Sequence, residues 1–260
     1  MRPGNGLGVV CPSDSLPGLE AVPFDQRLRA RLQENLQAHC RLEQPLEGRR
    51  AAAVAVVVID SDPYVQGDDP FPAGPADMSD IPGAEGSGLD GSIAGTSGGA
   101  AVILTRRATA MRAHPGQWAL PGGRLEVGES PLDAALRELH EELRLKLGPE
   151  AWIGTLDDYP TRSGYLITPV VLWADGEPDI LPDPREVRSV HRVAFSELCR
   201  PDSPRFVSIP ESDRPVVQIP VGRDLIHAPT GAVLLQFRRV AIEGVAERVH
   251  HYEQPVFAWR

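Results

Sequence analysis

Apolar residues follow helical spacing in two segments of this 260-residue chain. In one segment, Leu132, Leu136, Leu139 and Leu143 recur at steps of four, three and four residues, which places them on one face of a helix. In an earlier segment, residues 23–47, leucines recur at every fourth position. We expect this leading helix to pack on the domain that follows it, rather than to stay exposed as a partner-binding helix.

The start of the helix that contains Leu132 is marked by its capping residues. Ser130 is a favoured N-cap, Pro131 suits the first helical position, and Asp133 completes an S-x-x-D capping box. We therefore expect the helix to begin at Pro131.

Several short runs of β-branched and apolar residues predict strands on both sides of this helix. The predicted strands are residues 49–60, 99–107, 151–156, 165–174, 187–195, 216–219, 225–227 and 233–242. Between them we expect a short helical piece at 196–200 and a proline-rich loop at 201–215. Strands that surround a helix predict a mixed α/β sandwich.

The remaining segments are poor in large apolar residues and predict disorder. Residues 1–22 are punctuated by glycine and proline, and residues 61–98 are rich in Gly, Asp, Pro and Ser. We expect a disordered N-terminus and, at about 61–98, a flexible insertion between two strands. A lid over the substrate is the alternative interpretation of that insertion.

Composition excludes several classes of function. The formal net charge of −10 argues against nucleic acid as a partner. The chain contains no apolar run of transmembrane length and no signal-peptide pattern, so we expect no membrane association. Its 3 cysteines have no disulfide or metal-ligand spacing, which favours the reducing cytoplasm.

The predicted helix carries an acidic face beside its apolar one. Glu138, Glu141 and Glu142 stand at i, i+3 and i+4, so their carboxylates share one side. Because such like charges repel, and because hard divalent cations prefer oxygen ligands, we interpret the face as a platform for Mg2+ or Mn2+. The alternative is a solvated glutamate-rich surface, which would leave the preceding Pro121-Gly122-Gly123 unexplained.

The stretch before the helix reverses the overall charge of the chain. Between Gly91 and Leu125 there is no acidic residue. The same stretch contains a group of candidate cations: Arg106, Arg107, Arg112, His114 and Arg124. Cations beside a metal platform suit a substrate with more than one phosphate group. A plain basic surface patch is the alternative.

These residues resemble the Nudix box, G-x5-E-x7-R-E-U-x-E-E-x-G-U, where U is a bulky aliphatic residue. The matching positions are Gly123, Glu129, Arg137, Glu138, Leu139, Glu141, Glu142 and Leu145. Arg144 stands where the family has the glycine that ends the helix. We expect the helix to continue past Arg144 and to stop at Gly148 instead.

The resemblance implies a fold and a reaction. The fold would be a Nudix-type α/β/α sandwich over residues 48–260, with a mixed β-sheet and a loop–helix–loop catalytic motif. The reaction would be metal-dependent hydrolysis of a nucleoside diphosphate linked to another group. Glu138, Glu141 and Glu142 would be metal ligands, with the Gly123 carbonyl as a further candidate. Glu129 and Arg137 would brace the motif, and the general base stays open.

A second resemblance narrows the substrate. The run from Ile103 to Gly123 resembles the motif L-L-T-x-R-[SA]-x3-R-x3-G-x3-F-P-G-G of coenzyme A pyrophosphatases, with Leu120 in place of Phe. Thr161 and Ser163 lie in a segment that looks like downstream strands of the same subgroup. This implies cleavage of coenzyme A, or of acyl-CoA, to 3′,5′-ADP and 4′-phosphopantetheine.

Two other functions stay open at this point. One is a Nudix pyrophosphatase that acts on NADH, ADP-ribose or another nucleoside diphosphate derivative. The other is a catalytically silent nucleotide-binding module. The subgroup also continues into a final helix, whereas this chain stops at Phe257-Ala258-Trp259-Arg260. An absent helix would expose apolar surface that a homodimer could cover.

Overall fold

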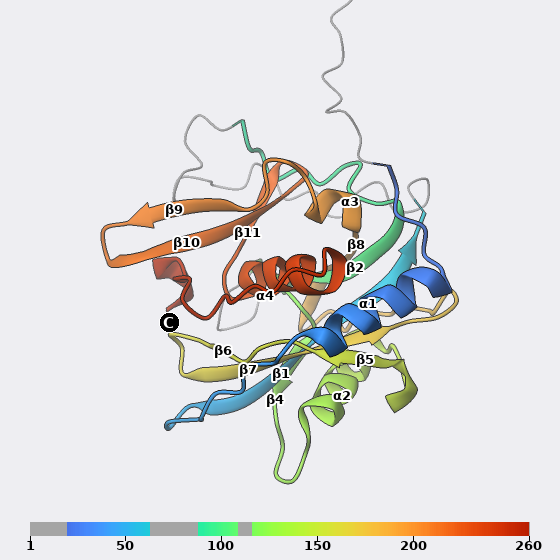
Figure 1. Cartoon of the computed structure of the whole chain (residues 1–260), viewed down its shortest axis with the longest axis horizontal. Helices are drawn as coiled ribbons and strands as arrows, with labels where there is room; N and C mark the ends of the chain where they lie inside the picture. The colour runs from blue at the N-terminus through green and yellow to red at the C-terminus, as the bar shows by residue number, and fades with distance from the viewer. Residues whose placement is uncertain (1–19, 63–87, 109–115, 260) are drawn as a thin grey trace, which may run out of the picture.

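A mixed β-sheet forms the centre of the molecule (Figure 1). The computed structural model describes residues 20–62, 88–108 and 116–259. Arg112, His114 and most of the predicted insertion therefore lie outside the described residues. The eight strands of the sheet are β1 (Arg50–Ser61), β2 (Gly99–Arg107), β3 (Trp118–Ala119), β4 (Gly122–Arg124), β5 (Trp152–Thr155), β6 (Tyr159–Pro160), β7 (Tyr165–Trp173) and β8 (Val187–Ala194).

The strand pairing confirms the mixed α/β class. The main path runs β3-β2-β1-β7-β5, while β4 pairs with β1, β6 with β7 and β8 with β2. Strands β1 and β7 are parallel, and the other pairs are antiparallel. Strand β1 is buried along nearly its whole length, as expected of a central strand covered on both faces.

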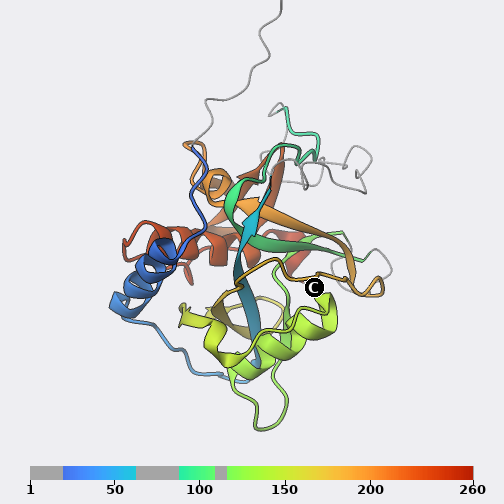
Figure 2. The ribbon, with the colours of Figure 1, turned by 90° about the vertical axis from the view of Figure 1, so that its right-hand side faces the viewer.

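Helices cover both faces of the central sheet (Figure 2). Alternate residues of β1 belong to different hydrophobic cores. Ala53, Ala55 and Val57 belong to a core with α2 (Pro131–Leu143). Val56 and Val58 belong to a second core with α1 (Gln26–Ala38) and α4 (Thr230–Gln236). No helix in the described ranges is long and apolar enough to cross a membrane.

A second, smaller sheet corrects one sequence prediction. It has the order β11-β10-β9. Its strands are β9 (Arg205–Ile209), β10 (Ser212–Val221) and β11 (Asp224–His227), and they follow the short helix α3 (Phe195–Leu198). The predicted loop at 201–215 is thus partly a β-hairpin.

The predicted strand at 233–242 is instead helical. Helix α4 continues as π-helical turns over Phe237–Ile242, and most of its residues are buried. The segment is apolar apart from Gln236, Arg238 and Arg239, and a short, mostly apolar run fits a buried helix and a buried strand equally well. Single turns of 3-10 helix at Pro149–Ala151 and Val256–Ala258 complete the fold.

Helix α2 begins as predicted but ends earlier. The Ser130 side chain accepts a hydrogen bond from the Asp133 backbone N–H, and both halves of the capping box are present. The helix stops at Leu143, and Arg144 adopts a left-handed conformation with φ of 56°. The prediction of an extension toward Gly148 is wrong, because the left-handed turn lets both Leu143 and Leu145 enter the core.

The left-handed Arg144 predicts a stabilising substitution. A Cβ at positive φ costs about 1 kcal/mol or more, whereas glycine adopts this conformation freely. We expect Arg144→Gly to have a free energy of unfolding about 1 kcal/mol above that of Arg144→Ala, measured by urea denaturation. Alanine is the matched control because it also removes the charge. Equal stabilities of the two variants would contradict this account of the helix end.

Candidate active site

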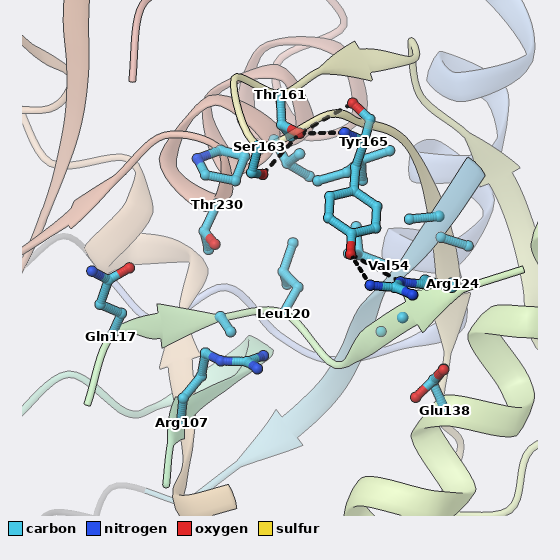
Figure 3. A pocket seen from close by; sticks show the side chains of 18 of the residues that line it. Val54, Arg107, Gln117, Leu120, Arg124, Glu138, Thr161, Ser163, Tyr165 and Thr230 are labelled. Carbon is cyan, nitrogen blue, oxygen red and sulfur yellow. Dashed lines mark hydrogen bonds between the residues drawn. The ribbon is translucent and has the colours of Figure 1, made fainter. Parts of the chain in front are cut away.

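One cavity of about 560 Å³ gathers most of the predicted site residues. It lies where β1, β4 and α2 meet the start of α4 and the C-terminal segment. In Figure 3, Glu138, Arg124 and Tyr165 lie on one side of the cavity, opposite Arg107 and Gln117. The predicted residues that line it are Arg107, Gly123, Arg124, Glu138, Glu142, Thr161 and Ser163. Its volume suits a small-molecule ligand.

Arg137 holds together the loop, strand and helix that form one wall of this cavity. Its Nε and Nη2 atoms donate to the Glu129 carboxylate at 2.9 and 3.1 Å. Nη2 also donates to the backbone carbonyl of Arg124 at 2.9 Å, and Nη1 donates to Glu138 Oε1 at 2.8 Å. These hydrogen bonds from Arg137 lower the pKa of Glu129. Arg137 and Glu129 therefore brace the wall without lining the cavity.

The acidic face of α2 divides into an inner pair and an outer residue. Glu142 is buried, with 6% of its surface exposed, and Glu138 is partly buried beside it. Glu141 lies outside the cavity, with 54% of its side chain exposed, and pairs with Arg137 at 3.3 Å. The structure brings together two of the three predicted ligands. Within the described ranges, no three His, Cys, Asp or Glu side chains are grouped to hold a metal.

The inner carboxylates are held in an unfavourable environment for two negative charges. Burial and, to a smaller extent, the nearby charge of Glu138 raise the pKa of Glu142 to about 8. Burial also raises the pKa of Glu138, although the hydrogen bond from Arg137 acts in the opposite direction. A bound cation would relieve both the burial and the repulsion. The donor set therefore fits a hard divalent cation.

Gly123 provides the space that Glu138 occupies. A Cβ built on Gly123 would lie 2.1 Å from Glu138 Oε1, which is far inside contact distance. The carboxylate is thus packed directly over the glycine, at the point where β4 pairs with β1. Any larger residue at this position would push the Glu138 carboxylate away from its present place.

Glu186 is an acidic residue of the site that the sequence did not single out. It precedes β8, lines the cavity, and its backbone N–H donates to the Asp183 carbonyl at 3.0 Å. Its charge contributes to the raised pKa of both Glu138 and Glu142. One glutamate in a loop forty residues after the helix carries no sequence signal of its own, because only the tertiary fold brings it to the helix.

Arg107 supplies positive charge in the same cavity. Its Nε is buried and has no hydrogen-bond partner among the described residues. No carboxylate in the described ranges pairs with it, although its charge favours ionised Glu142. An arginine with unused donors beside carboxylates is suited to bind an anion that also contacts a cation.

The prediction that Arg106 contacts substrate is corrected by its position. Arg106 is buried, pairs with Asp224, and stacks over the Trp118 ring at 4.1 Å. Trp118 Nε1 donates to the same Asp224 carboxylate at 2.9 Å. Because neighbouring residues of a strand point to opposite faces, Arg107 reaches the cavity and Arg106 does not.

The remaining predicted residues lie around Tyr165, at the end of the cavity formed by the connection between β6 and β7. Arg124 Nε donates to the Tyr165 hydroxyl at 2.9 Å (Figure 3). Thr161 and Ser163 belong to the tight connection between β6 and β7, where their hydroxyls lie 3.2 Å apart. The Thr161 hydroxyl also accepts from the Tyr165 backbone N–H at 2.8 Å. Polar groups thus line this end as well.

Comparisons with known proteins agree with the geometry. Residues 92–211 match the family model of the NUDIX domain. The protein named Uncharacterized Nudix hydrolase NudL, from Enterobacter sp. (strain 638), is 37% identical over 100 residues, or 38% of this chain and 52% of that protein. The m7GpppN-mRNA hydrolase NUDT17 of Danio rerio is 51% identical over 49 residues, or 19% of this chain and 16% of that protein.

The chain thus spans about half the length of the NudL relative, 52%. Among solved structures, a MutT/nudix family protein from Enterococcus faecalis has a TM-score of 0.40 and 16% identity, over 78% of this chain and 67% of that chain.

The raised pKa of Glu142 predicts a pH-dependent stability in the absence of metal. The ordinary pKa of this group is 4.5 and its folded value is about 8. Between these values the folded protein binds more protons than the unfolded chain, so the free energy of unfolding falls as pH rises. We expect Glu142→Gln to flatten this fall, measured by urea denaturation from pH 5 to 8 in EDTA.

Two controls isolate the cause of that slope. Adding Mn2+ at pH 8 should stabilise the wild-type protein more than Glu142→Gln, because the cation replaces the proton. The exposed Glu150→Gln should keep the wild-type slope. The same slope in wild type and Glu142→Gln would show that Glu142 is not buried as the structure places it.

Proposed function

We propose that the cavity hydrolyses the pyrophosphate of coenzyme A or of acyl-CoA, and the match of residues 92–211 to the family model of the NUDIX domain supports this proposal. The products would be 3′,5′-ADP and 4′-phosphopantetheine. The observation that supports this most is the pairing of opposite charges in one cavity. The carboxylates of Glu138 and Glu142 lie in the same cavity as Arg107, whose Nε is buried without a partner.

The reaction needs a divalent cation, Mg2+ or Mn2+, for which Glu138 and Glu142 are the proposed ligands. Glu141 and the Gly123 carbonyl are further candidates, and Glu141 would have to leave Arg137 to join them. When bound, the cation would neutralise the charge that builds up on the pyrophosphate oxygens.

The protein's own residues would perform the other steps. Arg107 would donate hydrogen bonds to a phosphate oxygen and so orient the pyrophosphate. Glu186, exposed at the cavity, is the candidate general base. It would accept a proton as a water oxygen bonds to phosphorus. The bond from that phosphorus to the bridging oxygen then breaks, and the second phosphate leaves.

A second substrate class stays open for a structural reason. With Arg106 paired to Asp224, the cations available to substrate are fewer than the sequence suggested. NADH, ADP-ribose or another nucleoside diphosphate derivative would use the same carboxylates and the same Arg107. A catalytically silent module is less well supported, because every glutamate of the box is present. The cytoplasmic location and the homodimer remain predictions.

Product analysis tests the proposal. We expect the pure protein with Mg2+ or Mn2+ to convert CoA into 3′,5′-ADP and 4′-phosphopantetheine, with much slower turnover of NADH and ADP-ribose. Glu142→Gln should lower kcat by about a hundredfold or more, because it removes a proposed metal ligand. Circular dichroism should show an unchanged fold.

The control for this experiment is Glu150→Gln, which changes an exposed carboxylate outside the cavity and should turn over CoA normally. Turnover of NADH or ADP-ribose but not of CoA would replace the proposed substrate. Near-normal CoA hydrolysis by Glu142→Gln would refute the assignment of the site.

A further inference from the structure

Three arginines that line the cavity have no carboxylate partner among the described residues. They are Arg50, Arg107 and Arg124. Elsewhere in this acidic chain many arginines are paired, as Arg29 is with Asp175. Clustering unpaired cations in one place is unfavourable unless an anion joins them. The charge of Arg107 acts on Glu142 and lowers its pKa, which leaves the other two arginines unexplained.

Arg50 and Arg124 converge on a single aromatic residue, Tyr165. The Arg50 guanidinium carbon lies 4.2 Å from the centre of the Tyr165 ring, and that of Arg124 lies 5.3 Å from it. Arg124 also donates to the Tyr165 hydroxyl through both Nε and Nη2. Two like charges are therefore held beside one ring. Among the described residues, their one further side-chain hydrogen bond is a long contact of 3.4 Å from Arg50 to the Ser163 carbonyl.

Strand register explains this convergence. Arg50 of β1 is the parallel partner of Tyr165 on β7, and Arg124 of β4 is the antiparallel partner of Ala52 on β1. Residues two apart on a strand share a face, so all these side chains emerge on the same side of the sheet. The cluster is built by three paired strands rather than by a mobile loop.

The cluster is separated from the carboxylate end by part of a strand. Gly123, which contacts Glu138, is the partner of Ala53, three residues along β1 from Arg50. At about 3.3 Å per residue, Arg50 is roughly 10 Å from this point. Arg124 directly follows Gly123 on β4, where neighbouring side chains point to opposite faces of the sheet. A group bound by Arg50 and Arg124 is thus a different part of the ligand from the group bound beside Glu138.

From this arrangement we infer that Arg50, Arg124 and the Tyr165 hydroxyl form a second anion subsite, which takes a phosphomonoester of the substrate. A phosphomonoester carries up to two negative charges and has several acceptor oxygens, which suits two guanidinium groups. The Tyr165 hydroxyl accepts from Arg124 and still has its own hydrogen to donate. Both arginines are exposed to solvent at the cavity, so the ligand can reach them.

This inference rests on the proposed function in one respect. If the substrate is coenzyme A, the phosphomonoester is its 3′-phosphate, because the pyrophosphate belongs at the carboxylate end. The subsite would then distinguish CoA from dephospho-CoA. Arg50 and Tyr165 would determine specificity without taking part in the bond cleavage.

The test compares ligands that differ only in that phosphate. We would measure binding of 3′,5′-ADP and 5′-AMP by isothermal titration calorimetry, in wild type, Arg50→Gln, Arg124→Gln and Tyr165→Phe. We expect wild type to bind 3′,5′-ADP at least tenfold more tightly than 5′-AMP. Each arginine variant should lose about tenfold in affinity for 3′,5′-ADP and little for 5′-AMP, because one charge-assisted contact is removed.

Arg49→Gln is the matched control, since Arg49 precedes Arg50 in the chain, is paired with Glu47 and does not line the cavity. It should retain the wild-type preference. An undiminished preference for 3′,5′-ADP in Arg50→Gln and Arg124→Gln would overturn the inference. Equal binding of the two nucleotides by wild type would overturn it as well.

A kinetic comparison separates the subsite from the proposed function. In each variant the ratio of kcat/KM for CoA to kcat/KM for dephospho-CoA should fall about tenfold, because only CoA carries the phosphate that the subsite binds. If wild type hydrolyses neither compound yet prefers 3′,5′-ADP through these arginines, the proposed function fails and the subsite stands. If wild type hydrolyses both equally, the function stands and the subsite fails.

Discussion

The arrangement of the cavity depends on the hydrogen bonds of Arg137. One guanidinium group joins Glu129 of the loop, the Arg124 carbonyl of β4 and Glu138 of the helix. Backbone hydrogen bonds alone would not fix the positions of these three groups relative to one another. Because Arg137 always carries its charge, the junction of strand, loop and helix stays closed over a wide range of pH. The position of the Glu138 carboxylate over Gly123 follows from this junction.

The acidic and the basic side chains that line the cavity near Arg137 lie in different parts of it. Glu138, Glu142 and Glu186 meet at one end of the cavity, and burial leaves Glu142 with a strongly raised pKa. Unpaired arginines line the remaining wall. Arg137 pairs with Glu138, whereas no ion pair among the described residues joins Glu142 or the lining arginines to an opposite charge, an arrangement that is common at ligand sites. A metal–phosphate ligand with a further phosphate group would complement both sets at once.

The sequence predicted local features well and distant ones poorly. Helix α2, its cap and the order of its charges depend on neighbouring residues, so periodicity was enough to find them. The role of Arg106 depended on Asp224, which lies far along the chain. Glu186 and Arg50 reach the cavity only through strand pairing and a long connection, so no local pattern could identify them. The sequence predicts a strand at 233–242, where the structure has a helix, because a mostly apolar run fits both elements when it is largely buried.

The central claim is that the inner carboxylates of α2 hold a divalent cation. The most direct test is to locate Mn2+ by anomalous scattering in crystals of the protein soaked with Mn2+. We predict a peak in contact with the carboxylates of both Glu138 and Glu142. A peak elsewhere with none at these side chains, or full occupancy of the same peak in Glu142→Gln crystals, would contradict the account.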